Sequence, residues 1–236
     1  MRKTILSALL IMFLVSSETL AQESSQSEQF ESKYWYLLGG YSQSVWSSTD
    51  WSDCSEYGSC VISQQDGKLS NLGAFSVSIG HQFAGWGYEI EYSARDEINA
   101  KSGRTVLKNG TIAQSGLGVF KTENLSINLT KDFWVKDDES FFGIIGIGSA
   151  EHYNDDAHLM VSGTKTEYGK ALTTKNTSYQ VGGGYRKELS NSFIFETRIK
   201  YSDLGKAYVW DRNTDNKEYG VSISSLDVGV NLIYKF

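Results

Sequence analysis

Residues 226–236, LDVGVNLIYKF, alternate apolar and polar side chains up to the last residue given. One set is apolar: Leu226, Val228, Val230, Leu232, Tyr234 and Phe236. The residues between them include Asp227, Gly229, Asn231 and Lys235. Because successive side chains of a β-strand point to opposite faces, this period of two predicts a strand with one apolar and one polar face.

The same alternation recurs along most of the chain and predicts eight strands in all. Their approximate ranges are 34–45, 72–83, 88–93, 123–134, 141–151, 178–188, 193–201 and 222–236. The fifth segment is rich in glycine and apolar at both parities, so its facing is not predicted. No proline occurs anywhere, which suits a chain made mainly of paired strands.

The connections between these segments alternate in length. Residues 84–87, 136–139 and 190–192 are short links, whereas the other connections are polar loops of roughly 20 residues. Short turns at one rim and long loops at the other are typical of outer-membrane barrels. We therefore predict an all-β fold, an eight-stranded antiparallel up-and-down transmembrane β-barrel.

A soluble β-sandwich would show the same alternation, so the position of the aromatic residues matters. One group falls at strand ends near the short turns: Trp35, Phe83, Trp86, Tyr88, Phe133, Trp134, Phe193 and Phe236. A second group falls towards the other rim: Tyr92, Tyr201, Trp46 and Trp210. Two aromatic girdles around an aliphatic middle favour the membrane barrel.

The beginning of the chain predicts export. Arg2 and Lys3 precede an apolar run at 5–15, and Ala21 offers a cleavage site. We expect a signal peptide at 1–21, a flexible leader at 22–32 and the barrel at 33–236. The net charge of −6 gives no electrostatic basis for nucleic-acid binding.

The two cysteines, Cys54 and Cys60, lie close together in the first long connection. In an oxidising compartment we expect them to form a disulfide that closes a small ring. The alternative is metal binding, but that segment contains no histidine or further cysteine to complete a ligand set.

Four segments carry a family resemblance. VGVNLIYKF (228–236) resembles the terminal signature of outer-membrane barrels, and RIKYSDLGK (198–206) resembles a motif of the OmpA-like and opacity-type eight-stranded barrels. GIIGIGSAEHY (143–153) and YQVGGGYRKEL (179–189) resemble the glycine-rich fifth and sixth strands of that family. The resemblance implies a Gram-negative outer-membrane location, with both termini in the periplasm. It also implies that the barrel-assembly machinery recognises Tyr234 and Phe236.

Eight strands leave an interior that side chains can fill. We expect a buried network of ion pairs among Glu89, Glu91, Arg95, Arg186, Glu196, Arg198, Lys200, Asp227 and Lys235. The alternative is a narrow, low-conductance ion path.

The sequence offers little for catalysis. It has three histidines, and His81 shares the parity of the apolar residues of its strand. His152 and His158 lie beside acidic residues at the start of the third long connection, where a metal cluster is the alternative to a solvated loop. Neither a His–Ser pair like that of the lipid A deacylase barrel nor an acyl-chain pocket is evident. We expect no enzyme and no cofactor, with a lipid-modifying enzyme as the less favoured alternative.

The long connections are the remaining candidates for function. They carry the aromatic residues Trp46, Trp51, Tyr57, Tyr153, Tyr168, Tyr208, Trp210 and Tyr219. Exposed aromatic tips on a scaffold suit a host or cell-surface ligand, whereas the alternative is that the loops only cover the barrel mouth against lipopolysaccharide. We expect a monomer in contact with outer-membrane lipid and lipopolysaccharide, acting in envelope integrity or surface attachment.

Overall fold

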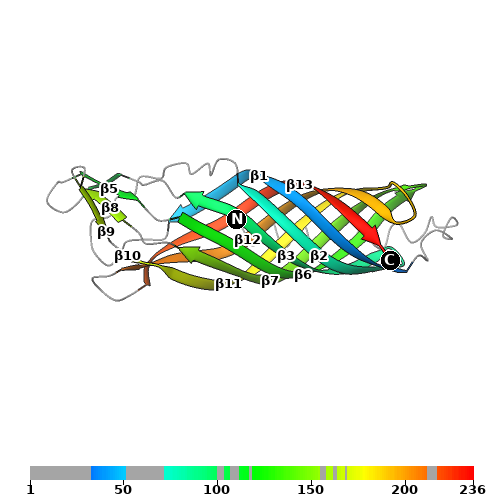
Figure 1. The fold of residues 1–236 in the computed structure, drawn as a ribbon, viewed down its shortest axis with the longest axis horizontal. Coiled ribbons are helices and arrows are strands. Elements are labelled where there is room, and N and C mark those ends of the chain that lie inside the picture. Colours follow the sequence, from blue (N-terminus) through cyan, green and yellow to red (C-terminus); the bar gives the residue numbers. More distant parts are fainter. Residues whose placement is uncertain are drawn as a thin grey trace.

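The computed structural model describes residues 33–51, 72–99, 104–106, 112–116, 119–154, 158–161, 164–167, 169–211 and 217–236. Eight long strands dominate these residues (Figure 1). They are β1 (Tyr34–Trp51), β2 (Gly73–Phe83), β3 (Trp86–Asn99), β6 (Val119–Lys136), β7 (Glu139–Asn154), β11 (Leu172–Glu188), β12 (Phe193–Asp211) and β13 (Lys217–Lys235). Within the described ranges, no helix is long and apolar enough to cross a membrane.

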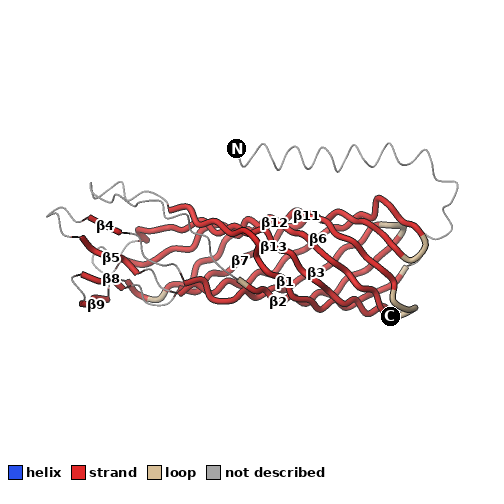
Figure 2. The backbone as a smooth tube through the Cα atoms, turned by 90° about the horizontal axis from the view of Figure 1, so that it is seen from above, coloured by secondary structure: helices blue, strands red, loops and turns tan. Residues whose placement is uncertain are grey.

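The eight strands form one closed antiparallel sheet. They are hydrogen-bonded in the order β12-β11-β7-β6-β3-β2-β1-β13, and β13 pairs back onto β12. At the closure, the Trp35 amide donates to the Phe236 carbonyl at 3.2 Å, and the Phe236 amide donates to the Trp35 carbonyl at 2.9 Å. The strands cross the barrel axis obliquely (Figure 2). The predicted fold class is therefore confirmed.

Three tight connections join the strands at one end, as predicted. Ala84 and Gly85, with φ of 47° and 72°, form a two-residue turn, so β3 begins at Trp86 rather than after Gly87. Positive φ at both central residues is the backbone of a type I′ hairpin, whose twist matches that of the strands. A second two-residue turn, 137–138, joins β6 to β7, and residues 189–192 join β11 to β12.

The opposite end differs from the prediction, because several strands continue far into the connections expected to be loops. β12 and β13 stay paired as far as Trp210 and Lys217. Four short strands form a second sheet in the order β4-β5-β8-β9: β4 (Arg104–Val106), β5 (Ile112–Gly116), β8 (His158–Val161) and β9 (Thr164–Glu167). These segments are stabilised by backbone hydrogen bonds to the neighbouring strands. The alternation of side chains along the sequence does not reveal such backbone pairing.

The pleat places polar side chains inside the barrel and apolar ones outside. On β6, Asn128 is fully buried whereas its neighbour Ile127 is 62% exposed. β7, whose facing was not predicted, turns its even positions inward, and Phe142, Ile144 and His152 among them are buried. Apolar residues also enter the interior near the short turns, where Tyr36, Leu38, Ile194 and Ile233 form a cluster.

Six of the eight aromatic residues expected in loops lie instead on barrel strands: Trp46, Trp51, Tyr153, Tyr208, Trp210 and Tyr219. Tyr153 points outward from β7 and is 37% exposed. Tyr57 and Tyr168 lie outside the described residues. These six positions therefore belong to the strands of the barrel and not to its loops.

Candidate functional site

The barrel interior contains a chain of ion pairs centred on Arg198. Its Nη1 atom donates to Glu89 at 2.7 Å and to Glu91 at 3.1 Å, and its Nε atom donates to Glu196 at 2.8 Å. Lys200, one step along the same face of β12, pairs with Glu91. All five residues come from inward positions of β3 and β12, which face each other across the barrel.

Arg186 extends this network towards the short turns. Its Nε atom donates to Glu196 at 2.9 Å, and its Nη1 atom donates to Asp132 at 3.2 Å. The guanidinium carbon lies 4.0 Å from the ring centre of Phe142, within the range of a cation–π contact. Asp132 was not among the predicted members, although its parity on β6 matches that of the polar residues Asn128 and Thr130.

A separate pair lies nearer the long connections. Arg95 binds Asp227 through two hydrogen bonds of 3.0 and 2.6 Å, the bidentate geometry that orients both groups. The Asp227 carboxylate also accepts hydrogen bonds from Ser44 at 2.6 Å and Ser225 at 3.1 Å. β1, β3 and β13 are thus tied together through one carboxylate.

Neutral side chains complete the network, and the sequence analysis missed them. Asn128 donates to Glu89 at 3.0 Å, Asn231 donates to Glu196 at 2.7 Å, and the Tyr36 hydroxyl donates to Glu89 at 3.2 Å. A buried carboxylate is costly unless hydrogen bonds satisfy its oxygens. Asn128 and Asn231 occupy the polar alternate positions of their strands, and this could have predicted that they face the interior. Tyr36 gave no such signal, because both faces of its segment are apolar.

Lys235 lies apart from the other predicted members. It pairs with Glu188 at 3.1 Å at the mouth of the barrel, where the Glu188 side chain is half exposed. As the last residue of β13, it is too near the strand end to reach the buried carboxylates. The structure therefore brings together the other eight predicted residues in two groups, and places Lys235 at the rim.

The segment that resembles a family motif forms a bulge in β12. The Gly205 amide donates to the Asp203 side chain at 3.1 Å, and the pairing with β13 shifts between these residues. Gly205 has a φ of 80°, a conformation that glycine adopts at little cost. The bulge turns Leu204 fully into the interior.

His152 is not part of a solvated loop. It lies inside the barrel on β7, with one ring nitrogen 2.9 Å from Thr122 Oγ1 and the other 2.9 Å from the Leu204 carbonyl oxygen. Because both nitrogens are engaged with protein atoms, His152 is not placed to ligate a metal. His158 lies on β8, and the described residues contain no group of three His, Cys, Asp or Glu side chains placed to hold a metal ion. His81 faces outward, as predicted, among the rings of Trp35, Phe83 and Tyr88.

The outer surface of the barrel carries a wide uncharged band. Its outward positions contain no Asp, Glu, Lys or Arg over residues 35–43, 75–83, 86–94, 141–149, 177–185, 193–201 and 226–236. On β6, Lys131 lies over the ring of Trp86 at 4.7 Å and marks the edge of the band near the short turns. A tilted strand needs about 9–11 residues to cross a bilayer, which is the length of these segments.

Aromatic side chains follow the short-turn edge of this band. Trp35, Tyr88, Trp134, Phe141 and Phe193 are each between 40% and 46% exposed. Tyr234 and Phe236, the residues predicted to act in assembly, are 45% and 60% exposed, with ring centres 6.2 Å apart. They share the outward face of the final strand; their recognition by the assembly machinery stays a prediction.

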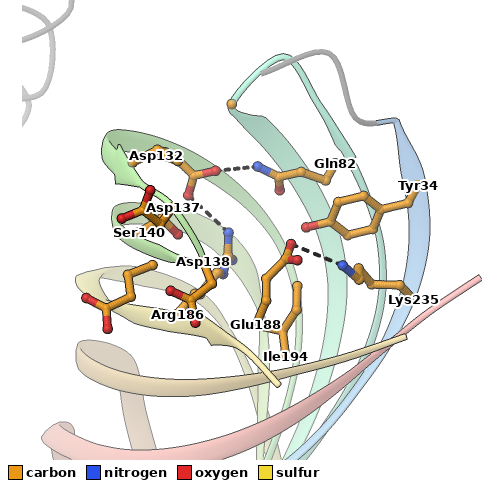
Figure 3. Close-up of a pocket in the computed structure, with 13 residues that line it drawn as sticks. Tyr34, Gln82, Asp132, Asp137, Asp138, Ser140, Arg186, Glu188, Ile194 and Lys235 are labelled. Carbon is orange, nitrogen blue, oxygen red and sulfur yellow. Dashed lines mark hydrogen bonds and ion pairs between the residues drawn. The ribbon is translucent and has the colours of Figure 1, made fainter. Parts of the chain in front are cut away.

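A cavity of 290 Å³ opens at the short-turn mouth (Figure 3). Gln82 and Asp132 meet on one side of it, at 2.7 Å between Nε2 and Oδ2. Glu188 and Lys235 meet on another side. The aromatic and apolar part of the cavity wall is formed by Tyr34, Val135 and Ile194.

Cys54 and Cys60 lie outside the described residues, so their disulfide stays a prediction. The signal peptide and the leader also lie outside them.

Comparisons with solved structures agree on the fold. Neisserial surface protein A is similar with a TM-score of 0.50 and 11% identity, over 87% of this chain and 100% of that one. A major outer membrane protein from Thermus thermophilus gives a TM-score of 0.50 and 9% identity, over 87% and 100%. Ail, the attachment invasion locus protein of Yersinia pestis, gives 0.44 and 13%, over 87% and 99%. The two structures with a TM-score of 0.50 show that the chain has the fold of small outer-membrane β-barrels.

The sequence itself has no such match. No protein-family model matches the chain, and no curated protein matches it.

Proposed function

We propose that this protein spans the outer membrane as a monomeric, non-enzymatic barrel and acts in envelope integrity or surface attachment. The observation that carries the proposal is the second, four-stranded sheet at the end opposite the short turns. There, β5 of one long connection pairs with β8 of the next, and β9 adds to the same sheet. A hydrogen-bonded sheet beyond the barrel suits a contact surface better than unpaired loops do.

In this proposal the short-turn end faces the periplasm, together with both termini. The short links and the sheet-forming connections lie at opposite ends of the barrel, an asymmetry typical of outer-membrane barrels. The uncharged outer band between them supplies the surface in contact with lipid.

Lipopolysaccharide is the proposed partner at the outer edge of the band. Lys121 and Lys175 face outward there, with side chains 58% and 70% exposed. They pair with Glu97 at 2.9 Å and Glu151 at 3.5 Å. Exposed ion pairs of this kind contribute little stability, so these lysines can exchange their carboxylates for lipid phosphates.

We propose that the interior does not conduct ions. The network around Arg198 places paired charges across the barrel interior. Its carboxylate residues are each at most 1% exposed: Glu89, Glu91 and Glu196. Purified protein in planar bilayers should therefore give no channel steps. Regular steps would favour the low-conductance pore, and a changed lipid A mass on overexpression would favour a lipid-modifying enzyme.

Removal of the β8–β9 hairpin tests the attachment role. Replacing residues 158–167 with a short Gly-Ser link should leave barrel assembly intact but reduce the adherence of expressing cells to host cells or matrix. Sensitivity to detergents is measured in parallel as the readout of envelope integrity. If the truncated and intact proteins behave alike in both assays, the function proposed for this end is wrong.

A further inference from the structure

One cation lies on the outward face of β6 near the short turns. The outward positions of this strand are aliphatic over 125–129, and Lys131 is the next outward residue. Its ammonium group forms no ion pair with any described residue and lies 4.7 Å from the ring centre of Trp86, its partner on β3. The adjacent carboxylate, Asp132, faces the interior, where it pairs with Arg186. Lys131 therefore presents a charge that no carboxylate neutralises to the surroundings of the barrel.

Aromatic side chains lie on both sides of this ammonium group. Towards the short turn, β6 continues with Phe133 and Trp134, which are 41% and 42% exposed, and the Trp134 ring centre lies 5.3 Å from that of Phe141. Towards the middle of the band, Tyr88 on β3 is 41% exposed. Aromatic belts mark the interface between the hydrocarbon and the lipid headgroups. The ammonium group thus lies within the belt, at the depth of the headgroups, and not beyond it in water.

A lysine at this depth is stabilised by an anion. A charged side chain within a bilayer is costly unless another group pairs with it. The contact with the Trp86 ring is attractive, but it leaves the net charge in place. A lipid phosphate is the anion present at headgroup depth, and an ammonium group binds it through charge-assisted hydrogen bonds. An anionic lipid is favoured over a zwitterionic one, because the ammonium group of the zwitterionic lipid would be repelled by Lys131.

We infer that Lys131 and Trp86 form a site for one anionic phospholipid, of the phosphatidylglycerol type, in the leaflet at the short-turn end. The lipid phosphate accepts hydrogen bonds from the Lys131 ammonium group. An acyl chain lies along the outward residues Leu129 and Ile127, which are 38% and 62% exposed. The inference rests on the proposed transmembrane placement, and the proposed topology puts this leaflet on the periplasmic side.

Binding of matched lipids to the refolded protein tests this site. Full-length protein in detergent micelles is mixed with increasing amounts of phosphatidylglycerol or phosphatidylethanolamine with the same acyl chains, and native mass spectrometry counts the lipids bound. Phosphatidylglycerol should saturate a first site, with one lipid per chain. It should do so at a concentration about tenfold lower than phosphatidylethanolamine, because only the anionic lipid brings a net charge to Lys131.

Substitutions locate the bound lipid. Lys131→Gln removes the cation and should abolish the preference between the two lipids, whereas Lys131→Arg keeps a cation and should retain it. Lys121→Gln is the matched control, because Lys121 also faces outward but pairs with Glu97 at 2.9 Å at the opposite edge of the band. This control should leave the first phosphatidylglycerol site unchanged.

The inference is overturned if phosphatidylglycerol shows no saturable first site, if the two lipids bind alike, or if Lys131→Gln keeps the preference. It is also overturned if Lys121→Gln loses the preference as fully, since any exposed lysine would then serve. Gel migration before and after boiling checks the barrel of each variant separately. A folded barrel without the lipid preference would refute this site alone, whereas the absence of a folded barrel would contradict the proposed placement in the membrane.

Discussion

At the scale of single residues, the parity of the strands predicted which charges enter the barrel but not which partners they meet. Arg198 and Glu196 were expected inside because they share a face of β12. Their contacts with β3 depend on the stagger of strands across the barrel, which a single sequence does not specify. Tyr36 escaped prediction for a different reason: both faces of its segment are apolar, yet its hydroxyl reaches Glu89.

Arg198→Met should lower the free energy of unfolding by about 3–5 kcal/mol, because it leaves three buried carboxylates without their shared cation. Urea unfolding in phospholipid vesicles, followed by tryptophan fluorescence, measures the change. Lys187→Met is the matched control, since Lys187 pairs with Glu139 at the rim with 43% of its side chain exposed. That control should cost no more than about 1 kcal/mol. Equal losses for both variants would show that the buried network does not contribute as described.

Gly205→Ala should destabilise the barrel by about 1–2 kcal/mol, because an alanine resists a φ of 80°. The added Cβ would also lie 2.6 Å from Asn176 Cβ. Gly39→Ala is the control, since its Cβ would meet nothing within 4 Å on an extended strand. The same unfolding assay should find Gly39→Ala neutral or slightly stabilising. A tolerated Gly205→Ala would argue against the bulge.

At the scale of secondary-structure elements, the sequence predicted all eight barrel strands and the three tight connections. What it could not predict was where strands end on the opposite side. The 47–50 segment, SSTD, has no alternation, yet it pairs with 222–225 of β13. The four short strands of the second sheet are likewise held by backbone pairing. The facing of β7 could not be predicted either, because its inward side chains Phe142 and Ile144 are as apolar as its outward ones. The Phe142 ring lies under the guanidinium groups of Arg186 and Arg198, a contact that alternation does not reveal.

Ile127→Arg tests the assignment of the outer face of β6. Ile127 is 62% exposed in the middle of the uncharged band, so an arginine there should cost about 2–4 kcal/mol in a bilayer. Thr173→Arg adds the same side chain at an exposed position outside the band, where the cost should be about 0–1 kcal/mol. Unfolding titrations in vesicles compare the two. Equal costs would contradict the placement of the band.

At the scale of the whole molecule, polar contacts lie inside and apolar surface outside, the reverse of a soluble β-sandwich. Closure between β1 and β13 leaves the long strands without an open edge in the barrel body, as a strand structure in lipid requires. The charged interior and the uncharged exterior therefore have the same cause: the pleat of a closed sheet turns alternate side chains to opposite faces.

The migration of unheated and boiled protein on a detergent gel tests this account most directly. Outer membranes from expressing cells are dissolved in cold dodecyl sulfate, and one half of the sample is boiled. A closed barrel with a paired interior resists cold detergent, so we predict that the unheated protein runs at a different apparent mass and that boiling abolishes the difference. Identical migration of the two samples, or recovery of the protein in the soluble periplasmic fraction, would contradict the closed transmembrane barrel.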